Sequence, residues 1–253
     1  MAIKGDLAQI YAGCPVRIKE CNIAITQPKI YDICAFGEDN FLMAVQTFTD
    51  TARIVSPVKE GNSQLAMLED FQVLMVILDE DKDFQKNVKS FFEMIFPDYT
   101  VRFDPGSICF FTEESENRII GQINPMNFEI FEKILGEIFL PQGTKTSEDY
   151  NPANEIAAKI AEKLKKGNQL RQQMALEEGK DGGSLFSNYI SILSVGLAIP
   201  VQSLFNYTPF QLYDAFIRYT KKISFDMYQK VATTPMMDVS KMTEPDNWMD
   251  NLY

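Results

Sequence analysis

The 253-residue sequence contains no histidine, and this absence limits the chemistry that the chain can perform. Histidine is the commonest general base and transition-metal ligand in proteins, so every Ser-His or Cys-His nucleophilic site is excluded. The sequence also lacks the G-x-S-x-G signature and the G-x-x-x-x-G-K-[ST] motif of a phosphate-binding loop. We therefore expect a protein that is not an enzyme and that has no metal ion or other cofactor.

Cysteine is also scarce. No two of the four cysteines form a C-x-x-C pair: Cys14, Cys21, Cys34 and Cys109. A zinc knuckle or a thioredoxin-type site therefore has no support. The first residues lack the basic start and long apolar core of a secretory signal. The apolar stretch Ile192–Val201 is too short to span a bilayer. We expect reduced, mostly packed thiols in a cytosolic protein without a membrane span.

Positive charge is in short supply, since the net charge of the chain is −11. Residues 1–143 hold 12 basic and 22 acidic side chains, a balance of −10, whereas residues 144–253 hold 12 and 13, a balance of −1. Binding to nucleic acid depends on Lys and Arg neutralising the phosphate backbone. The composition therefore argues against a nucleic-acid-binding protein.

Hydrophobic residues, by contrast, make up 45% of the chain and include 19 phenylalanines, enough for a substantial core. The periodicity predicts a mainly α (α+β) protein, in which a helical N-terminal domain carries a small antiparallel β-meander and a C-terminal helical module follows. The elements expected in the first half are strands at 16–18 and 23–25, a helical hairpin over 28–48, helices at 62–79 and 84–96, strands at 100–103, 107–111 and 118–123, and a helix from 124 to about 140.

Two polar connectors divide the predicted organisation of the chain. Pro141–Pro152 ends the first domain, and Gly179–Gly183 forms a flexible joint. The predicted segments are an acidic helical domain with the meander at 1–143, a polar helix with linkers at 144–183, an aromatic-rich helical module at 184–233, and an extended tail at 234–253.

Three aspartates imitate the start of a calcium-binding EF-hand loop: Asp79, Asp81 and Asp83. The imitation fails because Phe84 stands where the loop needs a turn glycine and Ser90 stands where it needs a bidentate glutamate. We interpret these aspartates as a solvated corner between two elements.

A long amphipathic helix dominates the C-terminal module. Thr208 fits its N-cap, Pro209 its first position, and Gln211 completes a capping box. Its apolar residues recur at three- and four-residue steps: Phe210, Tyr213, Phe216, Ile217, Ile223, Met227 and Val231. Such a stripe is more often a core face than a partner-binding face, and we favour core packing for Phe210, Phe216 and Ile223.

This helix, T-P-F-Q-L-Y-D-A-F-I-R-Y, follows a short apolar helix and runs on to an acidic tail that reads E-P-D-N-W-M-D-N-L-Y. Over Asn151–Tyr253 the pattern resembles the tail assembly chaperones of long-tailed (siphovirus-type) bacteriophages. The resemblance implies a phage-encoded protein of the host cytoplasm that binds the tape-measure protein during virion morphogenesis. The tail-tube protein is a second candidate partner, and self-association into a homo-oligomer stays open.

The predicted partner-binding residues combine a thin helical stripe with the end of the tail: Ile156, Ile160, Leu164, Trp248, Met249, Leu252 and Tyr253. Trp248, the only tryptophan, either anchors the tail in a groove of a partner or folds back on its own module. Two other functions remain as alternatives. One is a structural virion protein, as a tail-completion or connector component, and the other is a small hydrolase or nuclease.

Overall fold

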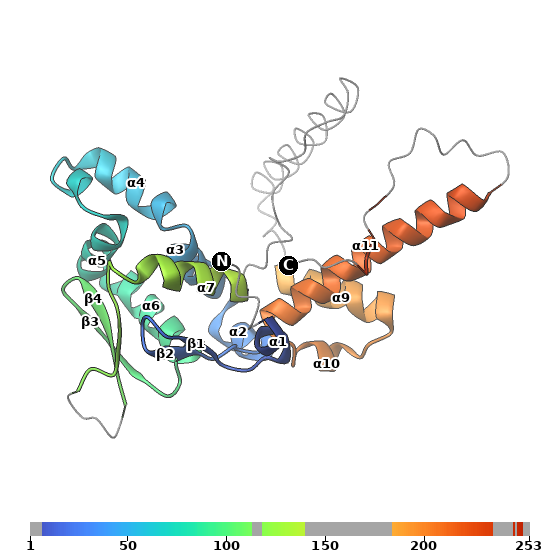
Figure 1. Ribbon diagram of the computed structural model, residues 1–253, viewed down its shortest axis with the longest axis horizontal. Helices are drawn as coiled ribbons and strands as arrows, with labels where there is room; N and C mark the ends of the chain where they lie inside the picture. The colour runs from blue at the N-terminus through green and yellow to red at the C-terminus, as the bar shows by residue number, and fades with distance from the viewer. Residues whose placement is uncertain (1–6, 113–117, 140–183, 235–244, 246, 250–253) are drawn as a thin grey trace.

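The computed structural model describes residues 7–112, 118–139, 184–234, 245 and 247–249 (Figure 1). This part of the chain is mainly α-helical and carries two small antiparallel sheets, as the sequence predicts. The sheets and the helices of residues 38–139 gather at one end of the molecule, residues 184–234 form the other end, and the helix at residues 7–12 lies beside the second end (Figure 1). Among the described helices, none is both long enough and apolar enough to cross a membrane.

The N-terminal segment is a small strand hairpin followed by two helices. Its elements are α1 (Leu7–Ala12), β1 (Val16–Ile18), β2 (Ile23–Ile25), α2 (Ile30–Phe36) and α3 (Glu38–Thr49). Val16 of β1 lies opposite Ile25 of β2 in an antiparallel register. Gly37 separates the two helices with a φ of 103°, a conformation that side chains disfavour. The predicted strands and helical hairpin are confirmed.

The next segment corrects the prediction of one helix over 62–79. It contains α4 (Thr51–Gly61), the 3₁₀ turn η1 (Leu65–Met67) and α5 (Asp70–Glu80). α5 begins only at Asp70 because Glu69 and Gln72 form a capping box, in which the Glu69 N–H donates to the Gln72 side chain at 3.1 Å. The sequence analysis does not predict α4, whose interior contains Pro57, a residue that usually breaks helices.

The predicted meander is confirmed between two helices. Its elements are α6 (Lys82–Ile95), β3 (Thr100–Asp104), β4 (Ser107–Phe111), β5 (Gly121–Ile123) and α7 (Phe128–Phe139). The strands pair antiparallel in the order β3-β4-β5, with Val101 opposite Phe110 and Ile108 opposite Ile123. A Cβ at Gly121 would lie 2.6 Å from the Cys21 carbonyl, so this strand packs tightly on the β1–β2 turn.

Phenylalanine rings fill the core between α3, α6, α7 and the sheet. Phe92 of α6 stacks on Phe131 of α7 with ring centroids 6.2 Å apart, and it meets Phe48 of α3 edge-on at 5.0 Å. Phe96 and Phe110 meet edge-on at 4.8 Å. These are the stacked and edge-to-face geometries that aromatic pairs prefer, so the rings fix how the helices sit on the sheet.

The C-terminal module is built from α9 (Leu185–Leu197), α10 (Val201–Leu204) and α11 (Pro209–Thr233). Thr208 caps α11: its side chain accepts from the Gln211 N–H at 3.3 Å, and the Gln211 side chain accepts from the Thr208 N–H at 2.9 Å. The predicted N-cap, Pro209 start and capping box are therefore confirmed.

This module shares its core with the first half of the chain. Phe186 of α9 lies 6.4 Å from the Phe41 ring of α3, and one hydrophobic cluster runs through both parts. The main-chain N–H groups of Ile30 and Tyr31 donate to the carbonyls of Tyr207 and Phe205, at 2.9 and 3.0 Å. The predicted connectors at 141–152 and 179–183 lie outside the described residues, so the domain boundaries stay a prediction.

Candidate protein-binding surface

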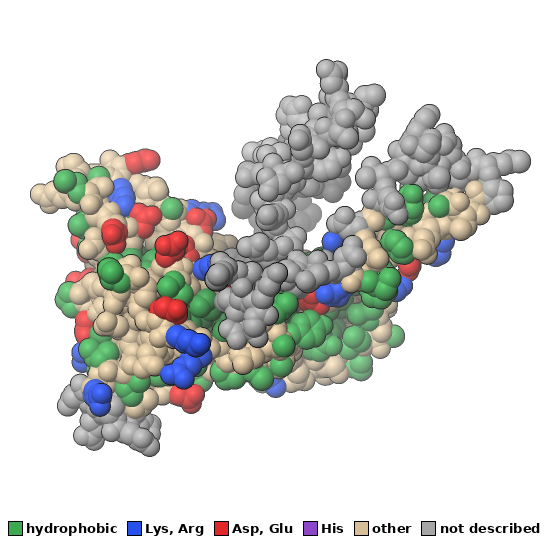
Figure 2. All heavy atoms as spheres, in the orientation of Figure 1, with side chains coloured by type: hydrophobic (Ala, Val, Ile, Leu, Met, Phe, Trp, Pro, Cys, Tyr) green, Lys and Arg blue, Asp and Glu red, His purple; other side chains and the backbone are tan. Residues whose placement is uncertain are grey.

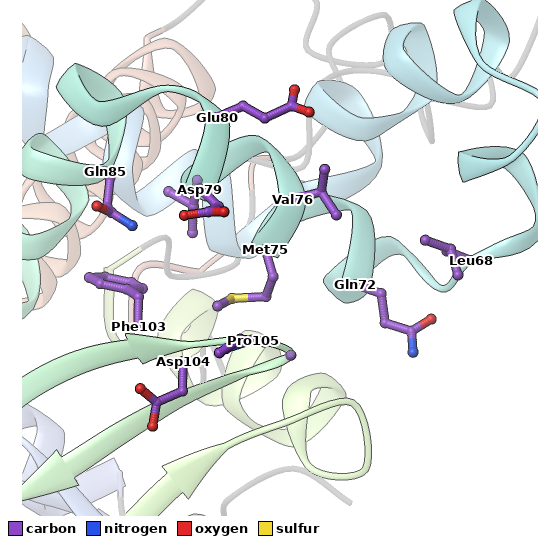
Figure 3. A pocket seen from close by; sticks show the side chains of 12 residues that line it. Leu68, Gln72, Met75, Val76, Asp79, Glu80, Gln85, Phe103, Asp104 and Pro105 are labelled. Carbon is purple, nitrogen blue, oxygen red and sulfur yellow. The ribbon is translucent and has the colours of Figure 1, made fainter.

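A pocket of about 400 Å³ lies between α5 and the β3–β4 turn (Figure 3). Met75 and Phe103 contribute apolar surface to it, and three carboxylates also line it. Asp79 pairs with Lys82 at 2.8 Å. Hydrogen bonds from the Arg102 guanidinium hold the pKa of Asp104 below its usual range. Two of the three carboxylates are thus committed to cations, an arrangement suited to a stable corner rather than to proton transfer.

A second pocket of about 400 Å³ brings carboxylates together beside α5 and α7. Burial, with the charges of Glu129, Asp50 and Asp70, raises the pKa of Glu132. Glu129 is exposed, however, and Asp70 pairs with Lys59 at 2.5 Å. The pocket therefore gathers acidic groups without enclosing them, unlike the buried pairs with which carboxylate enzymes work.

The three aspartates that imitate an EF-hand form part of a helix start. The Asp81 side chain accepts hydrogen bonds from the N–H groups of Asp83 and Phe84, at 3.1 and 2.9 Å, and so caps α6. Within the part of the chain that the structure describes, no group of Asp, Glu, Cys or His side chains could hold a metal ion. The solvated-corner interpretation fits this geometry.

The cysteines are free thiols, but only half of them are packed. Cys21 and Cys109 are buried, whereas Cys14 and Cys34 are exposed, so the expectation of mostly packed thiols is too broad. Burial raises the pKa of Cys21 to about 12, which keeps this thiol protonated and unreactive at neutral pH.

A buried ion pair joins α11 to α1 and to the C-terminal tail. Asp214 is fully buried, and the Arg218 Nε donates to both of its carboxylate oxygens at 3.2 Å. The Arg218 Nη1 donates to the main-chain carbonyl of Trp248 at 3.0 Å. The hydroxyl of Tyr11, in α1, donates a hydrogen bond to the Asp214 carboxylate. Burial and this carboxylate raise the pKa of Tyr11. Three segments of the chain, α1, α11 and the tail, thus meet at one charged cluster.

The C-terminal module presents large apolar side chains to solvent on all three of its helices. We call this set the module surface: Ile192, Val195, Leu197, Val201, Ile223 and Met227. Val195 is 85% exposed, and the whole run Ser184–Tyr213 contains no charged residue. Figure 2 shows hydrophobic side chains gathered over α9 and α11. Exposed apolar patches of this kind mark interaction sites on proteins.

The module surface arises partly because α11 is longer than its partner helix. Tyr219 meets α9 at Gly196, where a Cβ would lie 2.1 Å from the tyrosine ring. Beyond that crossing α11 projects away from α9 (Figure 1). Ile223 is 39% exposed there, so its predicted core position is wrong. Phe210, by contrast, is buried, and Phe216 is partly buried and stacks on Tyr189 at 4.1 Å.

Of the predicted partner-binding residues, two lie in the described part of the chain. Trp248 is partly buried and Met249 is 64% exposed. The others lie outside the described residues: Ile156, Ile160, Leu164, Leu252 and Tyr253. The sequence analysis misses the exposed residues of α9 and α10. The charge-free run Ser184–Tyr213 is the signal that could have found them.

Comparison with known proteins bears on the C-terminal module. No curated protein and no solved structure matched the chain. A family model did match: residues 179–253 fit the YomV second domain, which is a phage-type (Bacillus prophage) family. The matched residues include all of α9, α10 and α11 and the tail that Arg218 binds. The part of the chain that carries the module surface is therefore similar to a domain of phage proteins.

Proposed function

We propose that the protein is a phage tail assembly chaperone, without enzymatic activity, that binds the tape-measure protein through α9–α11. The observation that carries this proposal is the module surface, a set of exposed apolar side chains of which four lie within the charge-free run Ser184–Tyr213. The match of residues 179–253 to a phage-type family supports a phage role for the same segment. The resemblance of 151–253 to tail assembly chaperones supplies the specific role.

Simple physical chemistry supports such a pairing. A long helical tape-measure chain exposes apolar stripes until tube subunits surround it, and an apolar helix face binds well in or on another apolar surface. Covering an exposed side chain the size of Val195 or Met227 contributes about 1.5–3 kcal/mol. The net charge of −11 keeps such a complex in solution.

The test is co-expression with the tape-measure protein of the same phage, followed by pull-down and measurement of its soluble fraction. Val195→Asp places a charge on the module surface without touching the core, because Val195 is 85% exposed. It should weaken binding by about tenfold or more, since burying an unpaired carboxylate is costly. Met67→Asp is the matched control, because Met67 is 90% exposed in η1, far along the chain.

A second variant separates the two candidate binding elements. Ile160→Asp changes the predicted polar helix, which lies outside the described residues. If Ile160→Asp weakens binding and Val195→Asp does not, the partner sits on that helix and the assignment to the module surface is wrong. If the wild-type chain neither retains nor solubilises the tape-measure protein, the chaperone proposal fails.

The structural virion alternative is decided by composition of the particle. A chaperone is released as the tail tube assembles, whereas a tail-completion or connector component stays in fixed copy number. Mass spectrometry of purified virions should therefore find none of this protein. Its recovery at a fixed ratio to the tube subunit would replace the chaperone proposal with the structural one.

A further inference from the structure

We propose that the tail around Trp248 is an intramolecular ligand of α11, held by Arg218, and that partner binding displaces it. The docking part is independent of the proposed function, while the displacement part rests on it. The ligand is a named segment of this chain, Asn247–Met249, all of which the structure describes.

Arg218 is the residue of α11 that holds the tail. Arg218 is not a loose surface side chain, because both oxygens of the buried Asp214 hold its Nε at 3.2 Å. A guanidinium fixed in this way presents its remaining N–H groups in a set direction. Its Nη1 donates to the carbonyl of Trp248, a main-chain atom 30 residues away. A preorganised donor aimed at a main-chain carbonyl is a docking point for an extended or turning segment.

The tail forms a local turn at Trp248. The Asn247 Oδ1 accepts a hydrogen bond from the Met249 N–H at 3.1 Å, which closes a local turn around Trp248. Pro245, Asn247 and Trp248 are partly buried, whereas Met249 is 64% exposed. The segment is therefore seated on one side and open on the other, as a docked strap would be.

The face of α11 that carries Arg218 is partly buried beyond that residue. Lys221, Phe225 and Tyr228 follow Arg218 at three- and four-residue steps and are all partly buried, while Met227 is exposed. Reduced exposure thus continues along the Arg218 face in the half of α11 that projects past α9.

Charge supports the same pairing. α11 carries four basic and two acidic side chains, a balance of +2, and residues 234–253 carry one basic and four acidic side chains, a balance of −3. Opposite charges favour docking of the tail on its own helix over its release into solvent. The family match covers residues 179–253, so the tail is matched together with the helices.

Displacement follows from position. Ile223 and Met227 of the module surface alternate along α11 with the partly buried residues Lys221, Phe225 and Tyr228. Ile223 lies five residues beyond Arg218, so a partner helix that covers Ile223 and Met227 competes with the docked Trp248 for space at the neighbouring turn of α11. By linkage, a tail docked for about nine-tenths of the time lowers the apparent affinity for the partner about tenfold.

Docking is tested in the full-length chain without any partner, because Trp248 is the only tryptophan and reports on the tail alone. The readouts are the emission maximum and the acrylamide quenching constant, with a synthetic peptide of residues 241–253 as the undocked reference. Met249→Pro removes the N–H that Asn247 accepts and should shift both readouts to the peptide values. Met249→Ala keeps that N–H and should leave both unchanged.

Two variants of α11 extend this test of docking. Arg218→Ala should also move emission and quenching to the peptide values, whereas Lys222→Ala should not, although it removes a cation of the same helix that pairs with Asp226 at 2.6 Å. Arg218→Ala leaves Asp214 buried without its cation, so its fold is checked by circular dichroism. Met249→Pro lies in the tail and leaves the helices intact. Wild-type quenching equal to that of the peptide, or no response to Met249→Pro, overturns docking.

Displacement is tested with the tape-measure protein as the probe. If docking holds, binding should shift the Trp248 emission of the wild type, and Met249→Pro should bind about tenfold more tightly than Met249→Ala. Equal affinities of these two variants overturn displacement. Absence of binding by both variants and by the wild type means that the proposed function fails, while the fluorescence result on docking stands.

Discussion

Phe186→Ala tests whether the C-terminal module is part of the common core. The ring is 1% exposed and lies between two elements: its centroid is 6.4 Å from that of Phe41 in α3 and 6.2 Å from that of Tyr213 in α11. Phe-to-Ala changes in cores cost about 3–5 kcal/mol through lost transfer energy and the cavity left behind. Two ring pairs, each worth about 0.5–1.5 kcal/mol beyond area, favour the upper part of that range.

The assay is urea unfolding of the full chain followed by far-ultraviolet circular dichroism, which reports on helices of both halves. We expect Phe186→Ala to lower the free energy of unfolding by about 4 kcal/mol. Val195→Ala, on the exposed face of the same helix, should change it by less than about 0.5 kcal/mol. Because one hydrophobic cluster spans both halves, the whole transition should move to lower urea.

Two results would refute this reasoning. A loss below about 1 kcal/mol would mean that the Phe186 site contributes little, contrary to its burial. An early, separate transition, with the main one unmoved, would mean that α9–α11 unfolds by itself and that the shared core does not couple the two halves.

Three further predictions concern single sites, each checked by thermal or urea unfolding. Gly196→Ala should destabilise the protein by about 1–3 kcal/mol because the new Cβ displaces Tyr219, whereas stabilisation of about 1 kcal/mol, the usual helix effect, would show that this crossing is loose. Thr208→Ala should cost about 1 kcal/mol, and no loss would show that the capping box is idle. Glu132→Gln should stabilise at pH 7, because the raised pKa makes the charged form unfavourable in the fold, and this gain should vanish toward about pH 3, below the ordinary carboxyl pKa of 4.5, where the wild-type carboxyl is protonated in both states. An equal gain at both pH values would contradict the shift, and Glu80→Gln is the exposed control.

Local signals made much of the fold predictable. Thr208, Pro209 and Gln211 specify the start of α11 within four residues, and the structure places that start where they indicate. The start of α5 was harder, because Leu65 and Leu68 extend the helical spacing of its apolar stripe while the Glu69 capping box interrupts it. The spacing of apolar residues shows that a helix has a buried face, whereas the capping residues determine where that helix begins.

Ile223 shows the limit of such signals at the level of packing. A stripe states that a helix has an apolar face, but not how far a partner helix extends along it. α9 ends at Leu197, and the stripe of α11 runs on past it into solvent. The contact between Arg218 and the Trp248 carbonyl could not be predicted at all, because a main-chain acceptor leaves no mark in the sequence.

The hydrogen bonds from Ile30 and Tyr31 to the carbonyls of Tyr207 and Phe205 can form only late in synthesis. The acceptors leave the ribosome about 175 residues after the donors, a delay of roughly 10–35 s at bacterial and eukaryotic elongation rates. During that interval the first amides of α2 have only water as a partner, and the Phe41 ring lacks the cover of Phe186. The nascent chain therefore waits with part of its core open, and the balance of −10 over residues 1–143 disfavours association between neighbouring nascent chains during that interval.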